Sequence, residues 1–269
     1  MLYFVSTPIG NMGDITYRAV ETLKTVDIIA CEDTRHSLAL LSRYDIKKEL
    51  IAYHKFNEQK ETERIIGLLE SGKNVAVISD AGMPVISDPG NVLTKILAEK
   101  DIPFTVIPGA NAALSALILS GLNAENFTFI GFLPDKLKDR DSLIQRYEAV
   151  PSTLIFYVAP HDVTGVLEYL SGKFSGRKAA LVKEISKIHE TVYRFTFGDN
   201  FALDSPKGEF VLIVEGQKEA KTGFEDLPVE RHIKMYLDEG LSKKEAIKKV
   251  ASDRGVSKNS LYKYTIDIE

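Results

Sequence analysis

Three loops of the sequence combine glycine, proline and small polar residues directly after short apolar segments. They span residues 6–14, 79–90 and 108–113. In an open α/β sheet, ligands bind beyond the carboxyl ends of the strands, so such loops are candidate binding sites. Taken alone, the first loop is more simply a strand-to-helix turn, and the third could equally reflect close packing of small residues; the dinucleotide fingerprint G-x-G-x-x-G is absent. The second loop is too rich in Gly, Pro and Asp to be a minimal connection, and it predicts a ligand site.

Individual residues of these loops indicate what kind of ligand they would hold. Gly82 permits a close approach of backbone to a ligand, and Asp80 could bind a ribose hydroxyl or a cationic group. The small residues after Pro108 offer backbone against which a flat adenine ring could lie. Asp88 and Pro89 also have a local explanation, because Asp at an N-cap followed by Pro at the first helical position predicts the start of a helix.

A group of charged residues follows the second apolar segment, at the same edge of the predicted sheet. Its members are Glu32, Asp33, Arg35 and His36. A carboxylate here could accept a proton, and Arg35 could hold a phosphate through two hydrogen bonds. An equally simple interpretation is that Asp33 caps the following helix, which would run through Leu41, and that Arg35 pairs with an acid. Lys183, Glu184 and Lys187 are weaker candidates, because charges at strand ends are commonly solvated.

Short apolar segments in the first half of the chain predict the strands that would position these loops. They cover residues 2–6, 27–30, 50–53, 75–79 and 104–107, and their nearly continuous apolar character predicts buried parallel strands. Amphipathic helical patterns lie between them, so the order is strand, helix, strand and predicts an α/β sheet. Residues 110–120 are apolar nearly all round and end at Gly121, which predicts a buried helix.

The second half predicts another α/β domain and a helical tail. Strand patterns occur at residues 127–132, 153–158, 179–184, 191–197 and 209–214. The last two follow each other without a helix, which indicates an antiparallel portion. Helices are predicted at 228–238, 242–253 and 257–264, the second of them opened by a capping box from Ser242 to Glu245. The predicted division is 1–123 and 124–216 for two α/β domains, 217–225 for a linker and 226–269 for a helix-turn-helix-like tail.

Composition limits the classes of protein that the sequence can represent. The chain has 269 residues with a net charge of −4, and it has no apolar run long enough to span a membrane. Cys31 is the only cysteine and no secretory signal is visible, so a cytoplasmic protein without disulfides is expected. The five histidines and the cysteine lack metal-ligand spacing, so no metal is predicted. Residues 231–269 carry a charge of +3, and this tail could touch phosphate or simply be a solvated helical face.

Seven motifs in one order give the sequence a family resemblance. They lie at residues 7–11, 32–36, 79–84, 86–90, 108–113, 131–134 and 183–187. Together they resemble the ribose 2′-O-methyltransferases of small-subunit ribosomal RNA, a family of the tetrapyrrole-methylase superfamily. The resemblance covers almost the whole chain, including the helical tail found in some members. It implies two α/β domains of the class III methyltransferase type, with the cofactor in a cleft between them.

The resemblance also implies a cofactor, S-adenosyl-L-methionine, and its contacts. The three loops would supply them through Pro8, Gly10, Asn11, Asp80, Ala81, Gly82, Pro84, Ser87, Pro108, Gly109, Ala110, Asn111 and Ala112. A ribose hydroxyl is a poor nucleophile at neutral pH, so a base or an electrostatic partner would help its methylation. On this interpretation the catalytic candidates are Glu32, Asp33, Arg35 and His36.

The expected substrate is a cytidine near the decoding centre of small-subunit ribosomal RNA, and family members are usually homodimers. One motif departs from the family pattern, because Val158 and Asp162 stand where Glu and Arg are usual. Two other functions stay open at the sequence level. One is methylation of a tetrapyrrole or another small molecule on the same scaffold, which would not require the charged motif at residues 32–36. The other is a nucleic-acid-binding regulator that uses the tail, which would leave the three ligand loops unexplained.

Overall fold

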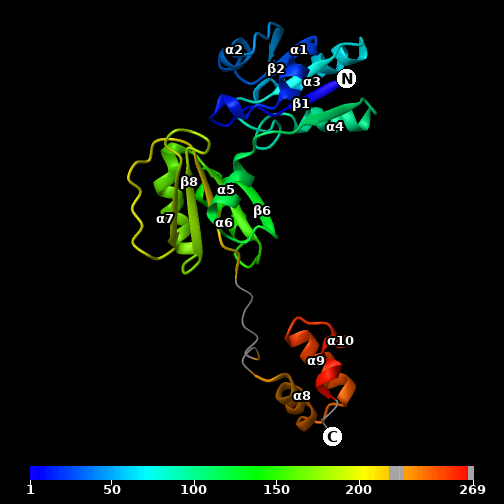
Figure 1. Ribbon diagram of the computed structural model, residues 1–269, viewed down its shortest axis with the longest axis vertical. Coiled ribbons are helices and arrows are strands. Elements are labelled where there is room, and N and C mark those ends of the chain that lie inside the picture. Colours follow the sequence, from blue (N-terminus) through cyan, green and yellow to red (C-terminus); the bar gives the residue numbers. More distant parts are fainter. Residues whose placement is uncertain (218–223, 225–226, 266–269) are drawn as a thin grey trace. The chain divides into compact units, whose positions relative to one another are not determined.

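The chain folds into two compact units. The computed structural model describes residues 1–217, 224 and 227–265. The first unit is Met1–Gln217 and contains two five-stranded sheets, and the second is Lys218–Glu269 (Figure 1). Most of the predicted linker at 217–225 lies outside the described residues. The further division of the first unit at residue 123 stays a prediction, although each of its sheets has a hydrophobic core of its own.

The first sheet is parallel throughout. Its strand order is β3-β2-β4-β1-β5, formed by β1 (Leu2–Val5), β2 (Ile28–Cys31), β3 (Glu49–Ala52), β4 (Val75–Ile78) and β5 (Phe104–Ile107). All five predicted strands are present, and each end lies within one residue of its prediction. The central strands β1, β2 and β4 are almost wholly buried, as predicted. The edge strands are not, since Phe104 and Val106 of β5 are 38% and 44% exposed.

Helices cover both faces of this sheet. Helices α1 (Tyr17–Thr25) and α2 (Thr34–Arg43) pack with Val5 and Ile29 on one face. Helices α3 (Glu58–Glu70) and α4 (Asn91–Glu99) pack with Leu2 and Phe4 on the other. The split follows from strand geometry, because successive side chains point to opposite faces. Apolar residues therefore have to be nearly continuous along the central strands.

The neighbouring strands β1 and β4 send the chain to opposite faces of the sheet. The loop after β1 leads to α1 on one face, and the loop after β4 leads to α4 on the other. Such a divergence leaves a crevice at the carboxyl ends of the two strands, where ligands bind in open α/β sheets. The strand order thus places two of the three predicted ligand loops side by side.

The second sheet is mixed. Its order is β6-β7-β10-β8-β9, formed by β6 (Phe127–Phe132), β7 (Thr153–Val158), β8 (Lys178–Lys183), β9 (Thr191–Thr196) and β10 (Phe210–Val214). Only β6 and β7 pair in parallel. The predicted antiparallel portion is confirmed. Strands β9 and β10 follow each other along the chain without pairing, because β8 lies between them.

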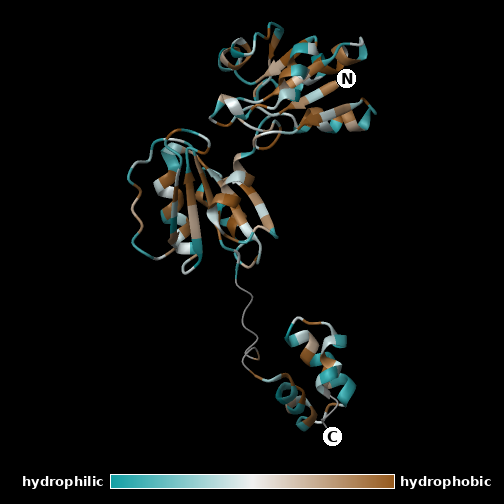
Figure 2. Cartoon of the chain, in the orientation of Figure 1, coloured by the Kyte–Doolittle hydropathy of each residue, from teal (hydrophilic) through white to brown (hydrophobic). Residues whose placement is uncertain are grey.

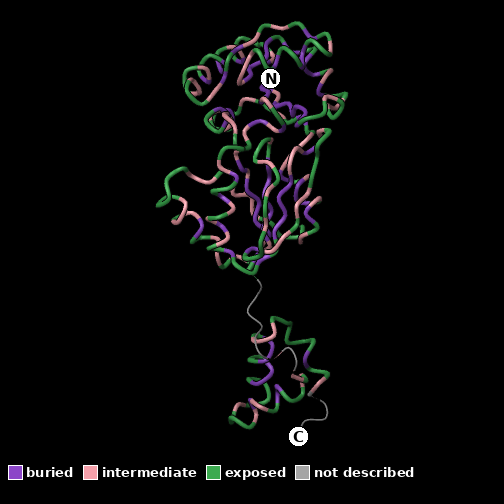
Figure 3. The backbone as a smooth tube through the Cα atoms, turned by 90° about the vertical axis from the view of Figure 1, so that its left-hand side faces the viewer, coloured by how far each residue is buried: buried purple, intermediate pink, exposed green. Residues whose placement is uncertain are grey.

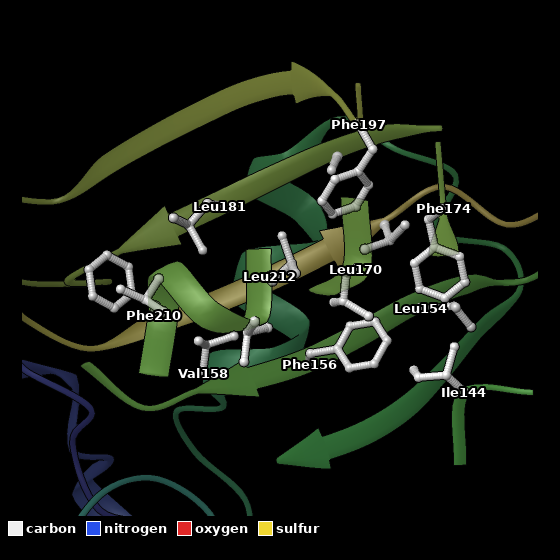
Figure 4. Close-up of a cluster of buried hydrophobic side chains, with 14 residues drawn as sticks. Ile144, Leu154, Phe156, Val158, Leu170, Phe174, Leu181, Phe197, Phe210 and Leu212 are labelled. Atoms are coloured by element: carbon white, nitrogen blue, oxygen red, sulfur yellow. The ribbon is translucent and has the colours of Figure 1, made fainter. Parts of the chain in front are cut away.

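Helices also lie on both faces of the second sheet. Helices α6 (Leu137–Ile144) and α7 (Val163–Lys173) contribute Ile144, Val166 and Leu170 to the cluster with Phe156 and Leu212 (Figure 4). Neither helix is predicted by the sequence patterns. Half of the residues of helix α6 are charged and one is buried, and α7 contains two glycines, so neither shows a strong amphipathic pattern.

Helix α5 (Ala112–Ser120) covers the opposite face of the second sheet. Ala113, Ala116 and Leu117 pack against it, and Gly121 ends the helix in the predicted left-handed conformation at φ 72°. The prediction of a buried helix is wrong for its outer side, because Leu114 and Ile118 are 46% and 76% exposed. Apolar composition alone cannot show whether a second layer covers that side.

The second unit is a small helical bundle. It contains α8 (Val229–Asp238), α9 (Lys243–Asp253) and α10 (Lys258–Leu261), followed by the short 3-10 helix η3 (Tyr262–Thr265). The predicted capping box between Ser242 and Glu245 is confirmed. Ile233, Ile247 and Val250 form the unit's own core, visible as buried and apolar segments in Figures 2 and 3. No helix in the described part of the chain is long and apolar enough to cross a membrane.

Helix α4 begins differently from the prediction. Asp88 and Pro89 precede the helix, and its N-cap is Gly90 at φ 135°. A carboxylate from another helix takes over the capping, since Glu58 Oε1 accepts hydrogen bonds from the backbone N–H groups of Gly90 at 2.8 Å and Val92 at 3.3 Å. Asp88 is therefore not the N-cap of α4. Glu58 of α3 anchors the far end of the ligand loop after β4.

The substitution Glu58→Ala should lower the free energy of unfolding by about 1–2 kcal/mol, because it removes the acceptor for two helix N-terminal N–H groups. Urea denaturation followed by circular dichroism measures this difference. Glu63→Ala is the matched control, since Glu63 is an exposed residue of the same helix and should change stability by less than about 0.5 kcal/mol. Equal stability of the two variants would contradict a capping role for Glu58.

Candidate active site

The loops after β1 and β4 are joined by backbone hydrogen bonds. Thr7 N donates to Gly82 O at 2.8 Å and Gly82 N donates to Thr7 O at 3.1 Å. The Thr7 side chain adds a hydrogen bond from its Oγ1 to Ser79 O at 3.1 Å. Gly82 has φ 80°, and a Cβ there would lie 3.1 Å from Ile9 Cγ2. Glycine is therefore required both by the left-handed backbone and by the close approach of the two loops.

The loop after β4 has an unusual backbone. Four of its residues have positive φ: Gly82 at 80°, Val85 at 76°, Ser87 at 69° and Gly90 at 135°. A β-branched residue such as Val85 is strongly disfavoured in this region. The conformation persists because the Val85 side chain packs on the core cluster beneath α3 and α4. Backbone strain of this kind concentrates at functional sites, where the fold holds it in place.

A cavity of about 340 Å³ lies between the two sheets, and we call it the main cavity. Six of the predicted cofactor residues line it: Asp80, Ala81, Gly82, Ser87, Asn111 and Ala112. The opposite wall comes from the second sheet and is mostly apolar, with Phe132, Tyr157, Val158, Ile185, Phe210 and Val211. The Tyr157 ring is fixed by edge-on contacts with Phe129 at 5.0 Å and a tilted contact with Phe132 at 5.5 Å between centroids.

A second cavity of about 220 Å³ adjoins the first, and we call it the side cavity. It shares Ile9, Asp80, Ala81 and Glu209 with the main cavity. Two further predicted cofactor residues, Pro8 and Gly10, line only the side cavity, together with His36 from α2 and Lys187 from the second sheet's side. The two cavities thus meet at Asp80 and Glu209, where the two sheets face each other.

Three carboxylates cluster at the carboxyl ends of β2 and β4. Burial, followed by the charges of Glu32 and Asp80, raises the pKa of Asp88 to about 6, against a small lowering by a hydrogen bond with Ser79. Burial and the charge of Asp80 also raise the pKa of Glu32, which His54 lowers slightly. The site therefore holds excess negative charge in a partly desolvated place, an arrangement that favours a cationic ligand.

The predicted catalytic residues occupy different positions. Asp33 caps α2 by accepting from Arg35 N at 2.8 Å, and its own N–H donates to Asp80 Oδ1 at 3.2 Å. The Arg35 side chain is 91% exposed and lies 3.8 Å from Asp33. Glu32 interacts electrostatically with Asp80 and Asp88, whereas His36 lines the side cavity. The structure thus places His36 at the side cavity and Glu32 beside the cavity-lining carboxylates Asp80 and Asp88, and it leaves Arg35 facing solvent.

Five predicted cofactor residues line neither cavity. Asn11 caps the short 3-10 helix η1 (Met12–Asp14) by accepting from Gly13 N at 2.9 Å. Pro84 is buried within the loop after β4, and Pro108 and Gly109 are exposed. Ala110 packs with the cluster beneath α5. These residues shape the loops, because a Cβ on Gly109 would lie 2.9 Å from Ser6 Cβ.

The second sheet contributes residues that the sequence did not predict for the site, together with Lys187, which the sequence indicated only as a weaker candidate. Ile185, Glu209 and Phe210 line the main cavity, and Lys187 and Glu209 line the side cavity. The segment 183–187 gave the only usable signal, as one of the motifs that carried the resemblance. Where the family motif departs, Val158 is buried and Asp162 accepts from Arg140 of α6 at 2.5 Å.

Sequence relatives are found over the whole chain. Residues 1–199 match the family model of the Tetrapyrrole (Corrin/Porphyrin) Methylases. The ribosomal RNA small subunit methyltransferase I of Halalkalibacterium halodurans is 42% identical over 268 residues, which cover 97% of this chain and 93% of that protein. The protein of the same name from Escherichia coli O157:H7 is 41% identical over 273 residues, which cover 99% of this chain and 94% of that protein.

Solved structures resemble the first unit at lower identity. Diphthine synthase superposes with a TM-score of 0.65 at 16% identity, covering 84% of this chain and 94% of that one. Uroporphyrin-III-C-methyltransferase from Thermus thermophilus superposes with a TM-score of 0.56 at 24% identity, covering 80% and 93%. These similarities show the two-domain α/β fold, and at such identities they show nothing further.

The substitution Asp88→Asn should stabilise the protein at pH 8. A raised pKa means that the folded state favours neutral Asp88, so its stabilisation is complete below pH 3.8 and is lost as the pH rises through about 6. The gain at pH 8 should be about 1–2 kcal/mol, because two pKa units correspond to at most about 3 kcal/mol and solvent screens part of it. This gain in stability of Asp88→Asn should shrink toward pH 4. Chemical denaturation at both pH values measures it, with the exposed Asp204→Asn as control; a stability loss at pH 8 would contradict the argument.

Proposed function

The chain belongs to the tetrapyrrole methylase family, and from this premise we infer that it transfers a methyl group from S-adenosylmethionine to RNA. The acceptor is the 2′-hydroxyl of a cytidine ribose in small-subunit ribosomal RNA, near the decoding centre. The observation that carries this inference is the identity of about 40% over nearly the full length to proteins named ribosomal RNA small subunit methyltransferase I. Methylation of a tetrapyrrole is supported by the family model and by fold similarity, but by neither of the two relatives at about 40% identity.

The main cavity has the chemistry that S-adenosylmethionine requires. The cofactor combines a flat adenine ring, a ribose and a positively charged sulfonium, and the cavity combines an apolar wall with the carboxylates of Asp80 and Asp88. Gly82 lines this cavity, and a Cβ there would lie 3.1 Å from Ile9 Cγ2, another residue of the cavity wall. We propose that Asp80, Gly82 and Ser87 hold the ribose and methionine parts, and that Asn111 and Ala112 lie against the adenine. When bound, the cofactor supplies an electrophilic methyl group.

The protein's own residues would then align the ribose hydroxyl and exclude water. Alignment of two reactants is a large source of rate enhancement, and a largely apolar cavity keeps the reacting atoms dry. We propose that Glu32 and His36 act on the RNA side of the cavities, where a carboxylate or imidazole can take the hydroxyl proton. Arg35 is the exposed cation beside them and is placed to bind a backbone phosphate. Asp33 supports them by capping α2.

Further features support proposals about assembly. Exposed apolar side chains on β5 and α5, namely Phe104, Val106, Leu114 and Ile118, suit burial in a homodimer. The helical unit carries exposed lysines, among them Lys248, Lys249 and Lys258, that suit contact with RNA phosphates. The alternative role of its apolar residues, packing on another domain, is not needed, since Ile233 and Ile247 are used in the unit's own core. We place the protein in the cytoplasm with its ribosomal substrate.

Removal of the protein from its host should abolish one 2′-O-methylated cytidine in small-subunit ribosomal RNA. Ribose-methylation mapping of the RNA, with and without the protein, detects this loss. Restoring the wild-type protein should restore the modification. An unchanged map would overturn the assignment of substrate.

Variants of the loop after β4 should weaken S-adenosylmethionine binding by about tenfold or more, because Asp80→Ala removes a polar partner and Gly82→Val places a branched side chain in the wall of the main cavity. Calorimetric titration measures the affinity. Gly72→Val is a matched control, since Gly72 also has a positive φ of 87° but has open space around it away from the cavities. Asp139→Ala serves in the same way for Asp80. Wild-type affinity in both folded loop variants would remove this loop from the cofactor site.

A further inference from the structure

The side cavity continues the main cavity without belonging to it. The two share Asp80 and Glu209, and the side cavity alone contains His36 and Lys187. If the main cavity holds the cofactor, as proposed above, then a second reactant has to approach from an adjoining space. The side cavity is such a space, and its chemistry can be inferred from the residues that line it.

Lys187 is held in a fixed position at the wall of this cavity. Its Nζ lies 3.0 Å from Glu184 Oε1 and 3.0 Å from Glu209 Oε2. Glu184 Oε1 also accepts from Glu209 N at 2.7 Å. Burial alone would lower the pKa of Lys187, but the hydrogen bonds with Glu184 and Glu209 raise it above its usual value. An ammonium group has three N–H donors, so one remains available to a ligand after these two contacts.

The backbone of the loop that positions Lys187 is strained. Glu184 and Ser186 both have positive φ, 54° and 66°. The loop that contains them packs directly on the first sheet's ligand loop, because a Cβ on Gly10 would lie 2.5 Å from Lys187 Cγ and 2.9 Å from Ile185 O. Ser186 also donates a hydrogen bond to Asp14. The lysine is therefore built into the junction between the two sheets, unlike a solvated lysine at a strand end.

The charges around Lys187 select the kind of ligand. Glu184 and Glu209 place two carboxylates beside one ammonium, and Asp80 is a further carboxylate in the wall of the same cavity. The surroundings are therefore net negative and repel a phosphate. A neutral sugar is compatible with them, because its hydroxyl groups can donate to carboxylates and accept from an ammonium. Phosphates have a better partner outside the cavity, in the exposed Arg35 one residue before His36.

We propose that the side cavity receives the ribose of the target nucleotide and that Lys187 donates a hydrogen bond to its 2′-oxygen. Lys187 is thus a positioning residue for the hydroxyl, which it holds beside the main cavity. The proposal rests on the proposed function and adds to it the subsite that recognises the sugar. It also gives the loop from Glu184 to Lys187 a role in substrate recognition.

The test compares two RNA probes. Unmodified small-subunit RNA is prepared with either ribose or 2′-deoxyribose at the nucleotide identified by methylation mapping. Their affinities are measured with S-adenosylhomocysteine bound, which cannot donate a methyl group. Wild-type protein should bind the ribose probe about tenfold more tightly, as expected for loss of a charge-assisted hydrogen bond. Lys187→Met should reduce this ratio to within about twofold, whereas Lys187→Arg should keep part of it.

Lys100→Met is the matched control, because Lys100 also pairs with a carboxylate, Glu70 at 3.1 Å, away from the cavities. It should keep the full ratio. If Lys187→Met keeps the wild-type ratio of ribose to deoxyribose affinity, the proposal is wrong. It is also wrong if the variant loses S-adenosylhomocysteine affinity by the same factor as it loses this ratio, because the side cavity would then belong to the cofactor. If Lys187→Met does not fold, Glu209→Gln is tested instead, because it weakens the ion pair that positions Lys187 and keeps the lysine. An unchanged affinity ratio in Glu209→Gln would also contradict the proposal. If the protein methylates its target nucleotide but Lys187→Met leaves the affinity ratio unchanged, only the proposed subsite is wrong. If methylation mapping finds no target nucleotide, the proposed function itself is wrong.

Discussion

The backbone bridge between Thr7 and Gly82 is the contact on which the site depends. It joins the loops of two neighbouring strands, β1 and β4, at the point where the chain leaves them toward opposite faces of the sheet. A divergence of this kind opens a crevice, and the bridge sets how the two loops border it. Only a residue without a Cβ fits at Gly82, so the loop after β4 has to turn there. Its strained continuation through Val85 and Ser87 to Gly90 is then held at the far end by Glu58.

The second sheet completes the site from across the crevice. Its strand ends supply an apolar wall, which includes Tyr157 and Phe210, and the loop after β8 crosses to contact Gly10. The division of labour follows from the composition of the two sides. The first sheet contributes backbone and the carboxylates of Asp80 and Asp88, whereas the second contributes mostly apolar surface together with Glu209 and the ammonium group of Lys187. A cofactor that is both cationic and aromatic requires the two together, which explains why the cavity lies between sheets and not within one of them.

The electrostatics of the site oppose folding and favour binding. The negative charges of Asp88, Glu32 and Asp80 lie close enough to disfavour one another. Burial further disfavours the ionised forms of Asp88 and Glu32. Such an arrangement is unfavourable in the protein alone, and a bound cation relieves it. The same negative surroundings disfavour phosphate near Lys187 and leave RNA phosphates to exposed cations, including Arg35. A net charge of −4 is thus compatible with action on RNA, because Asp80 and Asp88 line the cavity while cations such as Arg35 are exposed.

Local sequence patterns determined the strands of this protein and its α-helices other than α6 and α7, and only the tertiary structure decided which of these elements meet. Apolar periodicity placed all ten strands closely, and it placed the three ligand loops after the first, fourth and fifth of them, because these signals depend on neighbouring residues. The order β4-β1-β5, which sets those loops side by side, depends on long-range packing and has no local signal. For the same reason Asp88 was interpreted as a helix cap, although Glu58 from another helix performs that role. Lys187 resembled an ordinary solvated charge at a strand end, since nothing near it in sequence shows that Gly10, Glu184 and Glu209 surround it in the folded chain.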